Sequence, residues 1–273
     1  MILYKYVGYE AGLAIIKNNN IGFRQPIYLN DPTELSAAYP RIDYIDERDF
    51  LEMSKRRRLK DLAWRIHYAI LSLTRAPNNP LMWSHYSEDH KGFVIGFEVN
   101  NTFFSSEQLN LIPVQYGNVI YTTTKPIHEF ISKSDRIIEV ETEVAFIPER
   151  FENLQRIFLY KPMYWAYEEE VRVVKNVFRE NSEDKFQSGD FEIIKVNGHD
   201  LFVHSLPKNT IKEIYFGFKN SLIQNNNGER NELIKQILSH SSDVKFYMCV
   251  PDEITWDFIY FEIPSNKCLN SLS

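Results

Sequence analysis

The strongest constraint on the fold is an apolar run at residues 93–97, FVIGF, which follows Gly92 and a polar turn over residues 87–91. Consecutive apolar residues bounded by turn signals are typical of a strand that is buried on both faces. Directly before the turn stand four ring or hydroxyl side chains: Trp83, Ser84, His85 and Tyr86. Such side chains line pockets, but aromatic residues are also common in cores. The block is therefore either a pocket wall or ordinary core packing.

The rest of the chain predicts more strand than helix. An aromatic share of 14%, with 16 Tyr and 19 Phe, suits pleated surfaces. Further strands are expected at residues 1–6, 70–74, 170–174, 191–196, 201–203, 211–218, 244–250 and 256–263. Helices are expected at residues 10–18, 46–69, 125–146 and 229–239. Since no repeat or linker divides the chain, we expect one α+β domain over residues 1–273. It would be built on a mixed or mainly antiparallel sheet with flanking helices.

A β-hairpin is also expected between residues 112–116 and 119–121. Two short strand-like pieces there flank Gly117 and Asn118. Glycine and asparagine accept the positive φ values that tight hairpin turns require.

Composition limits the kinds of partner. The net charge of −6 argues against a broad contact with a nucleic-acid backbone, which requires a basic face. The basic run KRRRLK at residues 55–60 lies among acidic residues and is interpreted as a solvated helical face. No signal peptide or membrane-spanning stretch is evident, so we expect a cytoplasmic protein without a membrane partner. Cys249 and Cys268 cannot form a disulfide framework and are expected to be inert.

Two acids at the start of a predicted strand are the clearest catalytic candidates. Glu168 and Glu170 are separated by one residue, so in an extended chain both carboxylates would point to one face. One carboxylate could then stabilise a cationic transition state while the other orients the attacking group. The structural alternative is an ion pair between Glu170 and Arg172.

A second polar segment precedes the predicted helix at residues 46–69. Asn30, Asp31 and Pro32 form a turn signal, because Asn and Asp side chains bond to nearby amides and Pro fixes φ. Glu34 follows, and it is either a first-turn helix acid or a site residue.

Other catalytic motifs are absent from the sequence. The seven histidines show no metal-binding spacing such as H-E-x-x-H, so no metal site is predicted. A G-x-S-x-G nucleophile motif, a P-loop and a G-x-G-x-x-G loop are likewise missing.

Taken in order, the motifs resemble a widespread bacterial domain family of unknown function, over nearly the whole chain. The resemblance is carried by LYKY at residues 3–6, LNDPTE at 29–34, MWSHY at 82–86, HKGFVIGF at 90–97, KP at 161–162 and WAYEEEVR at 165–172.

The motifs are more distantly similar to the ADP-ribosyltransferase fold, especially bacterial DNA-targeting toxins of toxin–antitoxin pairs. That similarity implies NAD as substrate and Glu170 as the catalytic acid, with Glu168 beside it. It places Tyr4 or Tyr6 near the nicotinamide ribose and stacks Tyr86 on nicotinamide. The remaining candidate NAD-binding residues are Asn30, Glu34, Ser84 and His85.

Three functions therefore follow as hypotheses. The first is an NAD-dependent ADP-ribosyltransferase-like enzyme, of the kind that acts in bacterial antiviral defence or toxin–antitoxin conflict, with a nucleotide as ligand and its acceptor open. The second is a non-catalytic nucleotide- or peptide-binding regulatory module. The third is a divalent-metal hydrolase or nuclease that uses Glu34, Glu168, Glu170 and a histidine. The first predicts that all the motif residues converge on one cleft.

Overall fold

The computed structural model describes residues 1–31, 65–126, 144–178, 190–224 and 227–264. Several expectations concern segments outside these ranges. They are the basic run at residues 55–60, most of the helices at 46–69 and 125–146, and the side chains of Glu34 and Cys268.

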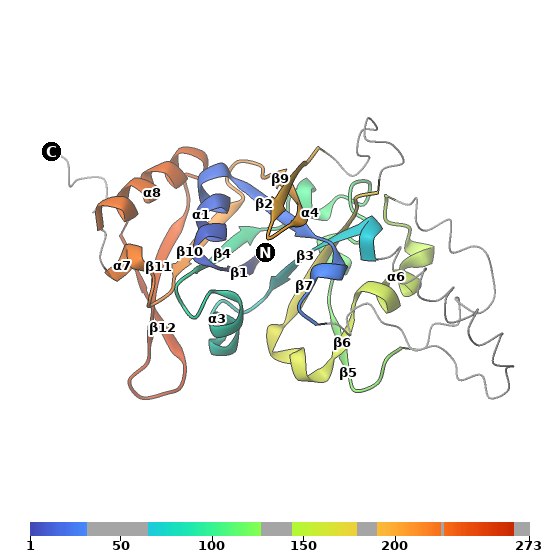
Figure 1. Cartoon of the computed structure of the whole chain (residues 1–273), viewed down its shortest axis with the longest axis horizontal. Helices are drawn as coiled ribbons and strands as arrows, with labels where there is room; N and C mark the ends of the chain where they lie inside the picture. The colour runs from blue at the N-terminus through green and yellow to red at the C-terminus, as the bar shows by residue number, and fades with distance from the viewer. Residues whose placement is uncertain (32–64, 127–143, 179–189, 225–226, 265–273) are drawn as a thin grey trace, which may run out of the picture.

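A ten-stranded sheet forms the centre of the molecule (Figure 1). The strands follow the order β12-β11-β10-β4-β1-β3-β2-β9-β8, and β7 also pairs with β3. Only β10 and β11 pair in parallel within this sheet, as far as the described strands go. The expected mainly antiparallel α+β fold is therefore confirmed.

The strand boundaries in the large sheet are β1 (Ile2–Val7), β2 (Asn20–Arg24), β3 (Tyr68–Thr74), β4 (Phe93–Glu98), β7 (Glu170–Asn176), β8 (Glu192–Val196), β9 (His199–Ser205), β10 (Ile211–Phe216), β11 (Lys245–Pro251) and β12 (Phe258–Glu262). A separate two-stranded sheet pairs β5 (Ile120–Thr122) with β6 (Tyr160–Pro162).

The α-helices are α1 (Tyr9–Asn18), α3 (Pro80–Tyr86), α4 (Thr102–Ser105), α6 (Phe151–Phe158), α7 (Ser221–Gln224) and α8 (Asn227–His240). Short 3-10 helices occur at η1 (Pro26–Tyr28), η2 (Val114–Tyr116), η5 (Pro148–Arg150) and η6 (Met163–Glu168).

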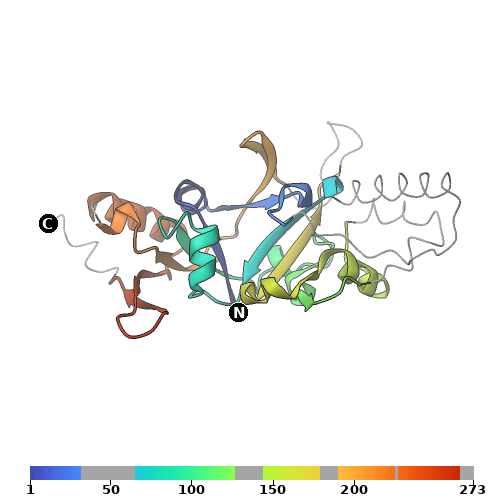
Figure 2. The ribbon, with the colours of Figure 1, turned by 60° about the horizontal axis from the view of Figure 1, so that its bottom comes forward.

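Strand β3 pairs with three other strands, and two of them share one of its edges, which leaves a gap in the sheet. On one edge β7 pairs with β3 along its full length, from Tyr68 opposite Asn176 to Thr74 opposite Glu170; Figure 2 shows the two strands side by side. The other edge is divided, because β1 pairs only at Thr74 and β2 only at Ile70. Four residues of strand span about 13 Å. The sheet therefore splits between β1 and β2, above the middle of β3.

Helices cover both faces of the sheet. Helices α1 and α8 lie side by side on one face (Figure 1), where His240 Nε2 is 2.9 Å from the Ile16 carbonyl oxygen. The main hydrophobic core lies beneath them and includes Leu3 and Phe93. Because side chains alternate along a strand, Tyr6 projects to the opposite face. There it packs with Met82, Trp83, Val94 and Tyr215.

The Trp83–Tyr86 block lies on helix α3, not in an extended segment. The Asn79 side chain accepts hydrogen bonds from the amides of Leu81 (2.9 Å) and Met82 (3.2 Å), and Pro80 occupies the first turn. Asn at the N-cap followed by Pro is a helix-start signal. The buried strand that follows, β4, is confirmed.

The hairpin expected around Gly117 and Asn118 is wrong. Residues 114–116 form η2, and β5 pairs in parallel with β6. Arg172 N instead donates to Gly117 O at 2.8 Å, and a Cβ on Gly117 would lie 1.9 Å from Arg172 O. The glycine is therefore needed for close approach to β7, and Pro113 before η2 has no amide proton for a ladder.

Among the helices that the structure describes, none is both long enough and apolar enough to cross a membrane.

Gly92 provides a test of this packing, since a Cβ there would lie 2.0 Å from the Val7 carbonyl oxygen. We expect Gly92→Ala to reduce the free energy of unfolding by about 1–3 kcal/mol, because β1 and β4 must separate. Urea unfolding measures the change. Gly8→Ala is the matched control, since its nearest neighbour is the flexible Glu88 side chain at 3.3 Å. Equal effects of the two substitutions would contradict the packing argument.

Candidate functional site

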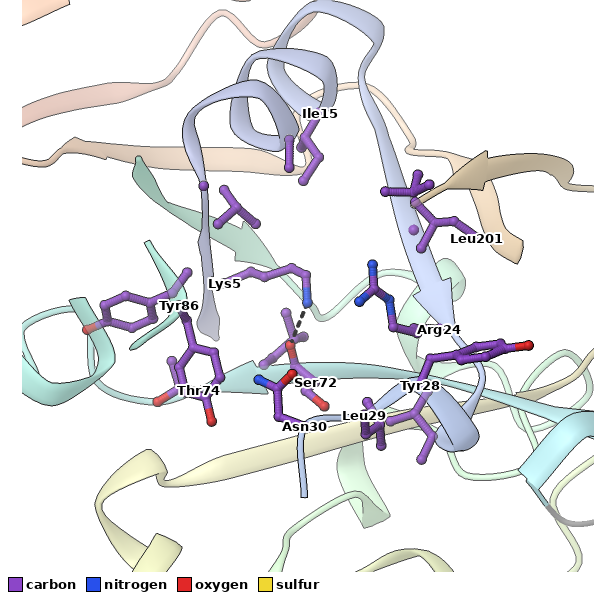
Figure 3. Close-up of a pocket in the computed structure, with 18 of the residues that line it drawn as sticks. Lys5, Ile15, Arg24, Tyr28, Leu29, Asn30, Ser72, Thr74, Tyr86 and Leu201 are labelled. Atoms are coloured by element: carbon purple, nitrogen blue, oxygen red, sulfur yellow. Dashed lines mark hydrogen bonds between the residues drawn. The ribbon is translucent and has the colours of Figure 1, made fainter. Parts of the chain in front are cut away.

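A cavity of about 690 Å³ occupies the split between β1 and β2 (Figure 3). Its base is β3, which contributes Ile70, Ser72 and Thr74, and α1 lies above it with Ala14 and Ile15. Ligand pockets typically have volumes of 300–1,000 Å³, so the cavity is large enough for a nucleotide-sized molecule.

Two buried acids and one lysine form one wall of this cavity. The Lys161 ammonium donates to Glu168 Oε2 at 2.5 Å and to Glu170 Oε2 at 3.0 Å. All three side chains are at most 6% exposed, and all three line the cavity. Strand β6 supplies the lysine, and the acids come from the junction of η6 with β7.

Further donors complete the acid wall. Arg172 binds the Glu170 carboxylate with two groups, Nε to Oε1 at 2.8 Å and Nη2 to Oε2 at 3.0 Å. Its Nη1 donates to the Phe158 carbonyl at 2.7 Å. The Tyr86 hydroxyl donates to Glu168 Oε1 at 2.6 Å. The sequence offered two alternatives for Glu170, an ion pair with Arg172 or a shared cleft with Glu168. In the structure both occur together.

The two acids converge because the backbone turns sharply between them. Glu168 ends η6, Glu169 adopts a left-handed conformation with φ of 44°, and Glu170 begins β7. The two carboxylates do meet, as expected. The expectation that an extended strand brings them together is wrong. Lys161, which joins them, belongs to the KP motif at residues 161–162, but no local signal in the sequence marks it as a site residue.

The two acids have different pKa values, because both contact Lys161 but only Glu170 also binds Arg172. Burial raises the pKa of a carboxyl, but Arg172 and Lys161 outweigh burial and hold the pKa of Glu170 well below its usual range. For Glu168, burial prevails over Lys161, and the charge of Glu170 adds to it, so its pKa is raised. Burial and the neighbouring Glu168 also raise the pKa of Tyr86.

Two further cations project into the middle of the cavity. Lys5 on β1 and Arg24 on β2 point toward each other across the split (Figure 3). Lys5 Nζ donates to the Ser72 carbonyl at 3.1 Å. Burial, with the charge of Arg24, lowers the pKa of Lys5 to about 8, although Glu170 opposes this shift. The family resemblance points to the tyrosines on either side of Lys5 and not to the lysine itself.

The other predicted residues fall into three groups. Asn30 lines the cavity, as do Tyr4 and Tyr6, but both tyrosine hydroxyls bond elsewhere. Tyr4 donates to Glu213 at 3.0 Å, and Tyr6 donates to the Ala76 carbonyl at 3.0 Å. Ser84 and His85 lie at solvent-exposed positions on α3 and are not among the described residues that line the cavity. The segment with Glu34 is not described.

Within the described residues, no group of three or more His, Cys, Asp or Glu side chains is arranged to hold a metal ion. Cys249 is buried, and burial raises the pKa of its thiol to about 12.

Comparison with known proteins identifies one related segment. Residues 82–173 match the model of a family described as a protein of unknown function (DUF2971). This stretch runs from within α3 to within β7 and covers about a third of the chain, less than the nearly full-length resemblance that the motifs indicate. No curated protein and no solved structure gives a significant match, and none of these comparisons yields an ADP-ribosyltransferase.

The acid wall predicts unequal costs for neighbouring substitutions. Glu170→Gln removes the charge that two buried cations share, so we expect a loss of about 3–5 kcal/mol in the free energy of unfolding. Glu168→Gln should cost less, because Glu170 still holds Lys161. The exposed Glu169→Gln is the control and should change stability by less than about 0.5 kcal/mol. Urea unfolding at pH 7 measures all three, and equal losses would contradict the assigned contacts.

Lys5 predicts a distinct pH dependence. Its pKa in the folded protein is about 8, below the ordinary lysine pKa of 10.5. Between these values the unfolded chain binds more protons, so stability rises with pH. The stability of the wild type relative to Lys5→Met should therefore increase from pH 8 to pH 10. The exposed Lys208→Met should show no such trend. Thermal unfolding across this range tests the prediction, and a constant difference would refute it.

Proposed function

We propose that the chain is an NAD-dependent ADP-ribosyltransferase-like enzyme and that the cavity binds NAD as its substrate. The observation that carries the proposal is the pair of buried acids, Glu168 and Glu170, on the wall of a nucleotide-sized cavity. Burial raises the pKa of Glu168, whereas Arg172 and Lys161 together hold the pKa of Glu170 below its usual range. Pairs of acids with separated pKa values are typical of acid–base sites.

The reaction divides into bond cleavage and bond formation at C1′ of the nicotinamide ribose. Nicotinamide leaves with the electron pair of the C1′–N bond, so positive charge develops on the ribosyl group. A fixed carboxylate beside this centre stabilises the charge in a cavity of low dielectric. Glu170 suits this role, because Arg172 and Lys161 keep it ionised.

The acceptor must lose a proton as its nucleophilic atom bonds to C1′. Glu168 is the better proton acceptor, since a carboxyl with a raised pKa holds a proton more readily near neutral pH. The Tyr86 hydroxyl fixes the orientation of that carboxylate through its 2.6 Å hydrogen bond. The Tyr86 ring, which also lines the cavity, offers an aromatic face for the flat nicotinamide ring.

A specific observation favours a second candidate, a binding module without turnover. Each of the four carboxylate oxygens of Glu168 and Glu170 already accepts a hydrogen bond from Tyr86, Lys161 or Arg172. A saturated network of this kind also suits a rigid wall that only shapes a pocket. Carboxylate oxygens have two lone pairs each, so the network leaves room for one further hydroxyl.

Nicotinamide release separates these two functions. The wild type, incubated with NAD, should release nicotinamide, which chromatography detects. Glu168→Gln should reduce the rate at least about 100-fold, because general acid–base groups contribute factors of this size. Tyr86→Phe should show a smaller loss, since the carboxylate remains.

Exposed Glu169→Gln is the matched control and should retain the wild-type rate. Glu170→Gln is assayed only below its own unfolding temperature, so that a lost fold is not mistaken for lost chemistry. If the wild type releases no nicotinamide but is stabilised against thermal unfolding by NAD, the enzyme function is rejected and the binding module is favoured.

A further inference from the structure

Lys5 and Arg24 are the unusual pair in the cavity, because they are like charges held close together. They extend from neighbouring strands into the split and point toward one another (Figure 3). Neither has an aspartate or glutamate oxygen within 4.0 Å among the described residues. The Ser72 carbonyl is the hydrogen-bond acceptor of Lys5, and it carries no full charge. Unpaired like charges in a partly buried cavity favour an anion between them.

The register of β3 orders the cavity along its length. Glu170 lies opposite Thr74 on one edge, Lys5 contacts Ser72, and Arg24 lies opposite Ile70. The strand positions opposite Glu170 and Arg24, which are Thr74 and Ile70, are therefore about 13 Å apart along β3. The ammonium of Lys5 lies between them. A ligand that contacts both ends must be elongated, with its negative charge away from the acid wall.

The cavity continues beyond Arg24 with an apolar wall. On β9, Leu201 pairs with Arg24 in the ladder and lines the cavity. The nearby η1 contributes Tyr28, which stacks on His199 at 4.1 Å between ring centroids. Further apolar lining comes from Ile194, Val196 and Val203. An apolar, partly aromatic surface of this kind suits a flat ring system.

Two other carboxylates line the cavity and contribute negative charge to it. Glu10 is exposed on α1, and Asp31 is buried and accepts from Trp165 Nε1 at 2.9 Å. Neither forms an ion pair with Lys5 or Arg24, so among the described residues that pair has no carboxylate oxygen within 4.0 Å.

We propose that Lys5 and Arg24 form an anion subsite that holds the diphosphate of a nucleoside-diphosphate ligand, with the base against the apolar wall of β8 and β9. This inference rests on the proposed function only in taking a dinucleotide as the complete ligand. The guanidinium of Arg24 provides paired donors that match phosphate oxygens, and Lys5 supplies a point charge beside them. Both cations act in binding and not in bond cleavage.

Calorimetric titration with ADP-ribose and with adenosine tests the subsite, because the two ligands share the base but differ in charge. Arg24→Gln and Lys5→Met should each weaken ADP-ribose binding about tenfold or more, while adenosine binding changes less than about twofold. Lys208→Gln, an exposed lysine outside the described cavity lining, is the charge-matched control and should bind ADP-ribose as the wild type does.

Inorganic pyrophosphate provides a test on the unaltered chain, in case a variant fails to fold. It should compete with ADP-ribose for the wild type and should not compete with adenosine. Equal weakening of both ligands by Arg24→Gln, or no competition by pyrophosphate, would overturn the subsite. ADP-ribose binding that depends on Arg24 without any nicotinamide release would retain the subsite and reject the transferase. If Arg24→Gln releases nicotinamide with an unchanged KM for NAD, the transferase is retained and the subsite is rejected.

Discussion

The ion-pair network of Glu168, Glu170, Lys161 and Arg172 is the interaction on which this part of the molecule depends. Burying four charged groups is unfavourable unless each is paired and hydrogen-bonded. Here two acids and two cations balance, and the contacts join β6, η6 and β7 into one block. Because the Arg172 amide also donates to Gly117, the segment before β5 is held to the same block. The wall of the cavity is therefore rigid for electrostatic reasons.

The opposite side of the cavity has a different origin. It exists because β1 and β2 each take only one end of the same edge of β3. Helix α1 joins these two strands, so its length separates them and its lower surface covers the opening. Lys5 occupies the gap in the ladder by bonding to the Ser72 carbonyl, which satisfies a backbone acceptor that a neighbouring strand would otherwise take. The break in pairing thus produces the cavity.

Sequence reasoning predicted most of what depends on local pattern. Strands β1 and β4, helix α1 and the acids at the start of β7 follow from periodicity and turn signals over a few residues. It did not predict which residues meet across the fold. Lys161 meets Glu170 through the pairing of β5 with β6 and the turn at Glu169. Lys5 meets Arg24 only because β3 is shared. Alternation along LYKY puts Lys5 and the tyrosines on opposite faces, but no local signal shows that Lys5 faces Arg24 across the cavity.

Sharing β3 also has a mechanical consequence for the whole sheet. Strands β4, β10, β11 and β12 attach through β1, whereas β8 and β9 attach through β2. Among the described strands, the two wings meet along the sheet only at the ends of one edge of β3, so few backbone hydrogen bonds join them directly. A ligand bound between β1 and β2 would contact both wings and so connect them. Its binding energy would then stabilise the arrangement of strands that it does not contact.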